Sequence, residues 1–299
     1  MKISQRFKPF LLHLCISAAV ALTVAAIIFG VWYPYPYRAI SGGTQLFLMI
    51  VSIDVIVGPL ITLIISKPGK SWRALAFDYC TIALLQLSAL AYGTWTMAAA
   101  RPLHMVFEKD LFRVVHVPEI LAEQWKRVPP GIEAQPLTGP DMLTARMPVD
   151  TDEKMASIDL ALAGVLEAFQ PALWTPYDGK AAFEAGRDMK DLRAKLPRDG
   201  AAIDTAVRAA GVPESDLRWT IVIGRQFITW TALLDKQGRI VAYAPLDPGL
   251  DLLPAGGGKS TEANAGAASA PASASASAAS AASSAAPAAS APASAASAD

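Results

Sequence analysis

Four residues in the apolar first third of the chain could bind a partner inside a membrane: Asp54, Gly58, Pro59 and Gln86. Asp54 lies near the middle of an apolar run, residues 44–65, and is the only acidic residue in the interior of the three such runs. A carboxylate at bilayer depth is costly and usually faces a protein partner or a cavity. The sequence therefore indicates a protein that binds another membrane-embedded chain or keeps a protonatable group within its own helices.

Gly58 and Pro59 follow Asp54 by about one helical turn and shape the helix there. Proline lacks a backbone N–H and glycine lacks a side chain, so the pair permits a kink and a close approach of another helix. The carbonyl of Val55, four residues before Pro59, is the one most affected. At about 1.5 Å per residue, Asp54 lies roughly 17 Å and Gln86 roughly 12 Å from the cytoplasmic ends of their helices, so a hydrogen bond between them is possible.

Two interpretations of this group remain open. In the first, Asp54 and Gln86 form a clamp that only holds the protein's own helices together. In the second, Asp54 engages the helix of a partner in a groove shaped by Gly58 and Pro59. Proton or ion translocation is disfavoured, because three membrane segments with one acid provide no relay.

Three apolar segments must position these residues. They run from about 10–33, 44–65 and 78–99, and each is long enough to cross a hydrocarbon core of about 30 Å. The first follows a basic flank like a signal peptide, but its apolar stretch is too long and two more segments follow. We therefore expect an uncleaved anchor and a three-span transmembrane region over residues 1–100.

Basic residues predict how these segments are oriented. The loop between the first two segments has only Arg38, whereas the N-terminal flank and the next loop are richer in positive charge. Their basic residues are Lys2, Arg6, Lys8, Lys67, Lys70 and Arg73. The positive-inside rule places both in the cytoplasm. We expect a multi-pass protein of a bacterial inner membrane, with the C-terminal domain in the periplasm.

Residues 101–254 are predicted to form one periplasmic α+β domain with a small antiparallel sheet. A hairpin is expected over 103–107 and 111–117, short helical stretches at 119–125, 180–196 and 201–210, a loop at 128–149, and strands at 219–223, 227–234 and 239–244. Thr151 is expected to be the N-cap of a further helix, whose apolar residues follow at helical spacing. These are Met155, Ile158, Leu162, Val165, Leu166 and Phe169.

Residues 255–299 consist almost entirely of Ala, Ser, Pro and Gly. Such a segment has no large apolar side chain whose burial would offset the entropy of ordering. We expect a disordered low-complexity tail.

Composition and motifs argue against several kinds of chemistry. The formal net charge of +0 and the absence of a basic run do not suit a nucleic-acid binder. The two cysteines fall in membrane segments, and no nucleotide loop, nucleophile elbow or zinc-protease motif is present. His104 and His116 flank the first hairpin but have no further ligand beside them. We expect no catalytic residue, no cofactor and no metal, and we interpret Trp174, Trp219 and Trp230 as packing in the sheet core.

A series of short motifs occurs in order along the first 115 residues. They are Trp32-Tyr33-Pro34, Asp54-Val55-Ile56-Val57-Gly58-Pro59-Leu60, Lys67-Pro68-Gly69-Lys70, Gln86-Leu87, Ala89-Leu90-Ala91-Tyr92-Gly93, Arg101-Pro102 and Val106-Phe107. In these motifs the chain resembles the type IV pilin accessory proteins of the TfpX/TfpZ family. The rest of the outer domain is similar only in layout, and the tail is not part of the pattern.

The resemblance implies an inner-membrane accessory protein that acts on pilin stability or on pilus assembly and retraction, without catalysis. The implied partners are a type IV pilin subunit, other inner-membrane pilus assembly proteins and membrane lipid. Two alternatives are a membrane-anchored periplasmic sensor and a membrane hydrolase. The sensor is disfavoured because the cytoplasmic parts are too small for an output module, and the hydrolase because no nucleophile and base are found.

Overall fold

Long helices make up the first hundred residues of the part that the computed structural model describes, residues 3–66 and 69–249. The helical elements are α1 (Ile3–Ile27), the π-helical turn η1 (Ile28–Trp32), α2 (Tyr37–Ile40), α3 (Gly43–Ser52), the π-helical turn η2 (Ile53–Val57), α4 (Gly58–Ile65) and α5 (Trp72–Ala99). The predicted tail, residues 255–299, lies outside the described residues, as do Lys2 and Lys67.

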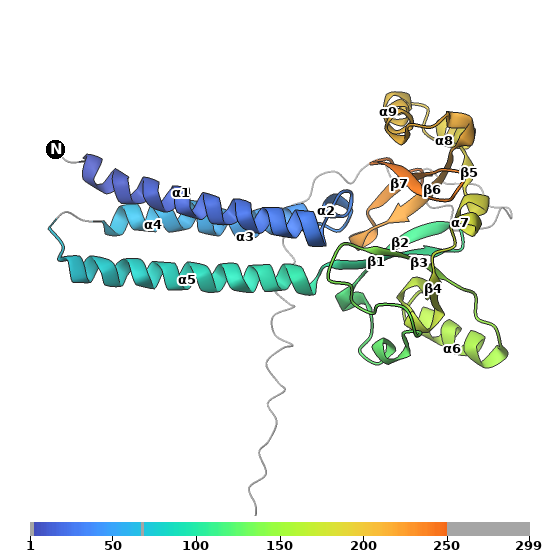
Figure 1. Cartoon of the computed structure of the whole chain (residues 1–299), viewed down its shortest axis with the longest axis horizontal. Coiled ribbons are helices and arrows are strands. Elements are labelled where there is room, and N and C mark those ends of the chain that lie inside the picture. Colours follow the sequence, from blue (N-terminus) through green and yellow to red (C-terminus); the bar gives the residue numbers. More distant parts are fainter. Residues whose placement is uncertain (1–2, 67–68, 250–299) are drawn as a thin grey trace, which may run out of the picture. The chain divides into compact units, whose positions relative to one another are not determined.

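Three helical segments within the described residues are long and apolar enough to cross a membrane, which confirms the prediction of three spans. They are Phe7–Trp32, Gly43–Ile65 and Trp72–Ala99. The third begins earlier than the hydropathy pattern suggests, because Ser71 caps it by accepting a hydrogen bond from the backbone N–H of Ala74 at 3.4 Å. The three helices lie side by side, with α4 in contact with both α1 and α5 (Figure 1).

Residues beyond 100 form a mixed sheet with helices, so the predicted fold class is confirmed. Its strands are β1 (Pro102–Glu108), β2 (Leu111–His116), β3 (Asp141–Ala145), β4 (Trp174–Pro176), β5 (Arg187–Asp188), β6 (Arg218–Ile223), β7 (Thr229–Leu234) and β8 (Ile240–Ala244). They pair in the order β4-β3-β1-β2-β6-β7-β8, with β5 beside β6. The predicted hairpin is β1 and β2, and the three predicted C-terminal strands are β6, β7 and β8.

The sheet is larger than predicted and not wholly antiparallel. β1 pairs parallel with β3, and β2 pairs parallel with β6. The segment 128–149, predicted as a loop, contributes β3. The glycines and prolines of this segment predict a loop, but five of its residues form a strand. That strand is stabilised by pairing with β1, which is distant in sequence. Such parallel partners need long connections, which a local pattern does not reveal.

The outer domain also contains short helices. They are α6 (Thr151–Leu162), α7 (Gly179–Ala185), α8 (Met189–Lys195) and α9 (Gly200–Ala210), of which α7, α8 and α9 pack against the sheet. The helix predicted over 180–196 is interrupted at Gly186, where a Cβ would press on the side chain of Arg218, and β5 pairs there with β6. The helical stretch predicted at 119–125 is instead two short 3₁₀ turns, η3 (Val117–Glu119) and η4 (Gln124–Arg127).

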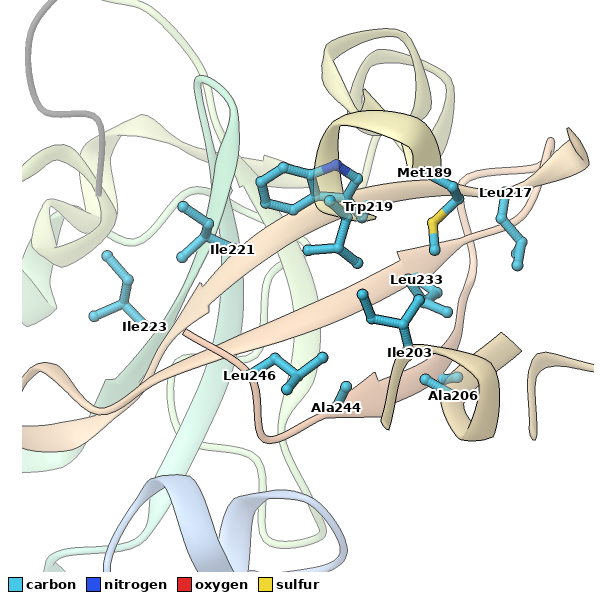
Figure 2. Close-up of a cluster of buried hydrophobic side chains, with 12 residues drawn as sticks. Met189, Ile203, Ala206, Leu217, Trp219, Ile221, Ile223, Leu233, Ala244 and Leu246 are labelled. Carbon is cyan, nitrogen blue, oxygen red and sulfur yellow. The ribbon is translucent and has the colours of Figure 1, made fainter. Parts of the chain in front are cut away.

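The largest core cluster joins α8 and α9 to the C-terminal strands. Figure 2 shows Trp219 of β6 near Met189 of α8 and Ile203 of α9 near Leu233 of β7, with Ile221 and Ile223 farther along β6. Trp219 and Trp174 are fully buried in two core clusters, and Trp230 is partly buried in a third, so the interpretation of these tryptophans as core residues is confirmed.

The short helix α2 belongs to the core of the sheet. Tyr37 and Ile40 pack with residues of β1, β2, β6 and β7, and Ile40 is fully buried. Gly224, after β6, lies against the carbonyl of Ile40 so closely that a Cβ would overlap it. The connection between the first two membrane segments is therefore a structural part of the outer domain.

Candidate functional site

The four residues predicted from the sequence lie together in the membrane bundle. Asp54 is in the π-helical turn η2, and Gly58 and Pro59 begin α4. Gln86 of α5 reaches across to this turn and donates a hydrogen bond from Nε2 to the backbone carbonyl of Asp54 at 3.0 Å. Gln86 therefore bonds the main chain at Asp54 rather than its carboxyl group.

The π-helical turn explains why this carbonyl needs a partner. In a π turn the N–H of residue i+5 bonds the carbonyl of residue i, and for Asp54 that residue is Pro59, which has no N–H. A carbonyl without a hydrogen-bond donor is unfavourable in hydrocarbon, and Gln86 supplies the missing donor. From the sequence, the Val55 carbonyl is the one expected to be most affected by Pro59. In the structure, Gln86 bonds the carbonyl of the preceding residue, Asp54.

Gly58 provides the room for this contact. A Cβ built at Gly58 would overlap the amide group of Gln86. The glycine thus lets the Gln86 side chain lie directly against the helix backbone.

His13 of α1 completes the network and was missed as a site residue by sequence reasoning. Its Nε2 lies 2.8 Å from Oε1 of Gln86, and its Nδ1 lies 2.5 Å from Oγ1 of Thr62 in α4. Because the Gln86 amide nitrogen faces a carbonyl, its Oε1 must accept, and the imidazole proton lies on Nε2. The signal available in the sequence was a histidine inside an apolar segment, which lacks polar partners nearby in the chain.

The carboxyl group of Asp54 is buried and unsatisfied. The residue is 7% exposed, and neither carboxyl oxygen has a hydrogen-bond partner among the described residues. Asp54 lines a cavity of about 360 Å³ between α1, the second segment and α5, together with His13, Thr62, Tyr79 and Gln86. The remaining walls are mostly aliphatic, from residues such as Leu12, Ile16, Val20, Ile82 and Leu90.

This arrangement divides two roles between neighbouring groups. His13, Thr62, Gln86 and the main chain of Asp54 hold α1, the second segment and α5 together. The Asp54 carboxyl group takes no part in that network and faces an apolar cavity. A buried polar group without a partner is costly, so the site is suited to receive a hydrogen-bonding group from outside the chain.

His104 and His116 are not brought together by the hairpin. His104 is the cross-strand partner of Val115, so the two side chains share a face, and the next residue, His116, points to the opposite face. His104 packs on Trp174 at 4.7 Å between ring centroids, and burial lowers its pKa to about 4. His116 places Nδ1 2.8 Å from the carboxylate of Glu119. Within the described residues, no group of three or more ligating side chains could hold a metal ion.

A second feature is the exposed face of α6. Asp150, not Thr151, caps this helix by accepting from the N–H of Glu153 at 2.7 Å. The helix ends at Leu162, and its apolar residues do not face the core: Met155, Ile158 and Leu162 are 56%, 52% and 84% exposed. These three residues, which we call the α6 stripe, form a solvent-facing apolar row.

Comparison with known proteins places this geometry in context. A family model described as "Fimbrial assembly protein FimB" matches residues 1–42. The chain is 32% identical over 242 residues to the fimbrial assembly protein of serogroup E1 from Dichelobacter nodosus, which covers 79% of this chain and 93% of the relative. The serogroup I protein matches with the same identity and coverage, and that of serogroups C1 and C2 is 42% identical over 113 residues, 38% of this chain and 86% of that one. No solved structure matches.

Proposed function

Because this chain belongs to the fimbrial assembly protein family, we propose that it is an inner-membrane accessory protein of type IV pili that binds the pilin subunit and modulates its stability or the assembly and retraction of the pilus. The resemblance of its first 115 residues to the TfpX/TfpZ proteins supports this finer assignment. The observation that carries the proposal is the unsatisfied Asp54 carboxyl group in a cavity inside the membrane bundle.

The proposed mode of binding follows from the chemistry of that cavity. Before assembly, a pilin subunit is anchored in the membrane by one apolar helix and has a globular head outside it. A polar group on such a helix would find a hydrogen-bonding partner in Asp54 and aliphatic walls around it. Gly58, Pro59 and Gln86 act as positioning residues, because they fix the turn that carries Asp54.

The outer domain offers a contact for the globular head. The α6 stripe is exposed, and large apolar side chains in a row on a soluble surface commonly mark interaction sites. Two contacts, one in the membrane and one outside it, suit a partner with a membrane helix and an external head.

Orientation and catalysis belong to the same proposal. The basic residues Lys70 and Arg73 near the start of α5 favour the cytoplasm for that end, which supports a periplasmic location for the sheet domain. We propose that the chain has no catalytic activity. A membrane aspartyl protease needs a second acid near the first, and Asp54 is the only acid in the interior of the three apolar runs. The sensor alternative predicts a stable cytoplasmic partner at the loop before α5.

The test is deletion of the gene, with total pilin measured by immunoblot and surface pili measured after shearing. Normal total pilin with altered surface pili indicates a role in assembly or retraction, and loss of total pilin indicates a stabilising chaperone. The deletion is complemented with the wild type, with Asp54→Leu, and with Thr81→Ala as a control on an exposed face of α5. No change in either pool on deletion would contradict the proposal and favour the sensor.

A further inference from the structure

A hollow of about 290 Å³ lies between the start of α3 and the turn that joins β6 to β7. Its polar lining consists of Ser41, Gln45, Arg225 and Gln226, and its apolar lining includes Leu46 and Met49 of α3. Because Gly43 begins the second membrane segment, the hollow lies where that segment leaves the apolar phase. This is the depth at which phospholipid headgroups lie.

Two sets of hydrogen-bond donors in the hollow have no partner. Ser41 is 3% exposed, and its Oγ makes no hydrogen bond within the described residues. α3 is preceded by Gly42, whose φ of 69° is left-handed, and no side chain of the described residues caps the helix. The first N–H groups of a helix lack intrahelical acceptors and attract anions.

Arg225 adds a positive charge to the hollow. The side chain is half-buried and forms no ion pair in residues 3–66 and 69–249. Its charge acts on the phenol of Tyr33, whose pKa burial nevertheless raises to about 12. A guanidinium group matches the geometry of phosphate oxygens and pairs with them through parallel N–H bonds.

The backbone of the turn holds these groups in place under strain. Gln226 and Phe227 have φ values of 57° and 59°, which non-glycine residues seldom adopt. The N–H of Gly224 closes the turn by donating to the carbonyl of Ile228 at 2.8 Å. Phe227, which follows Gln226 in this turn, is left 74% exposed, as is typical of an aromatic side chain in the interfacial layer.

We propose that this hollow binds the headgroup phosphate of an anionic phospholipid in the leaflet on the side of the sheet domain. Arg225 pairs with the phosphate, and Ser41 and the N-terminus of α3 donate hydrogen bonds to it. The acyl chains run along Leu46 and Met49, and Phe227 inserts beside them. A lipid suits the hollow better than free phosphate, because the apolar wall continues onto the exposed side chains of Leu48 and Met49.

The test is native mass spectrometry of the purified, delipidated full chain, with phosphatidylglycerol, phosphatidylcholine or inorganic phosphate added. We expect retained phosphatidylglycerol that Arg225→Gln reduces about tenfold, the loss expected from one charge-assisted hydrogen bond. Ser41→Ala should reduce it about threefold, since it removes one neutral donor. Arg198→Gln makes the same change of charge at an exposed position between α8 and α9 and should have no effect.

Each of three results would overturn the inference. Equal retention of phosphatidylcholine and phosphatidylglycerol would indicate ordinary lipid solvation. Unchanged retention in both Arg225→Gln and Ser41→Ala would exclude the hollow as the site. Displacement of the lipid by inorganic phosphate would show that phosphate alone is recognised. If Arg225→Gln lowers the melting temperature, Ser41→Ala alone decides, because the Ser41 hydroxyl has no partner in the part of the chain that the structure describes.

Discussion

Replacing Gly58 by alanine tests the proposed construction of the membrane site. The new Cβ would overlap the Gln86 amide, which approaches the helix so closely that it cannot remain in place. Displacement of the amide would break its 3.0 Å hydrogen bond to the Asp54 carbonyl. It would also break the 2.8 Å hydrogen bond between Gln86 Oε1 and His13 Nε2.

The expected cost follows from these contacts. Hydrogen bonds between membrane helices contribute about 0.6 kcal/mol each. Overpacking costs about 1–3 kcal/mol, and the better helix propensity of alanine returns about 1 kcal/mol. Gly58→Ala should therefore destabilise the bundle by about 1–3 kcal/mol.

The assay is reversible unfolding of the purified chain in mixed micelles, followed by circular dichroism. Gly30→Ala is the matched control, because a Cβ built there meets no atom of the described residues within 4 Å beyond its own stretch of helix. A double-mutant cycle with Gln86→Ala isolates the clash, because Gly58→Ala should cost much less in the Gln86→Ala background than in the wild type. Equal stability of Gly58→Ala and Gly30→Ala would refute the proposed packing of Gln86 against α4.

Three further predictions concern the outer domain. Gly224→Ala should lower the melting temperature of the full chain markedly, since its Cβ would overlap the backbone of Ile40. Gly200→Ala, where the added Cβ meets open space, is the matched control. Stability should fall by up to about 3 kcal/mol as the pH drops from about 6.5 to about 4, because the buried His104 stays neutral while the unfolded chain takes up a proton, and His104→Leu should remove this part of the pH dependence in thermal unfolding. Met155→Ser and Leu162→Ser should change the free energy of unfolding by less than about 0.5 kcal/mol, since both side chains are exposed, but should lower surface pili in complemented cells; a large loss of stability would contradict the exposure of the α6 stripe.

Features governed by local sequence were predictable. The three membrane segments follow from hydropathy, and α9 follows from its spacing and from Gly211, which ends it with a φ of 69°. The strands β1, β2, β6, β7 and β8 follow from β-branched and aromatic runs with turns between them.

Features governed by contacts between distant residues were not predictable. β3 depends on its parallel pairing with β1, and α2 depends on burial against strands far along the chain. In the membrane site, Asp54, Gly58, Pro59 and Gln86 were recognised from their types, but the role of His13 depends on Gln86 and Thr62 of two other helices. Gln86 bonds the main chain of Asp54 because of the π turn, and no single residue in the sequence predicts that turn.

The most direct test of the central claim is co-purification of pilin with the tagged full chain carrying Asp54→Leu, Asp54→Asn or the control Thr81→Ala. If the Asp54 carboxyl group binds pilin, Asp54→Leu should co-purify far less pilin at a normal level of the protein. Asp54→Asn, which keeps hydrogen-bonding groups, should retain more. Unchanged pilin recovery with Asp54→Leu, or disappearance of the protein itself, would contradict the claim and leave Asp54 as part of the bundle's own structure.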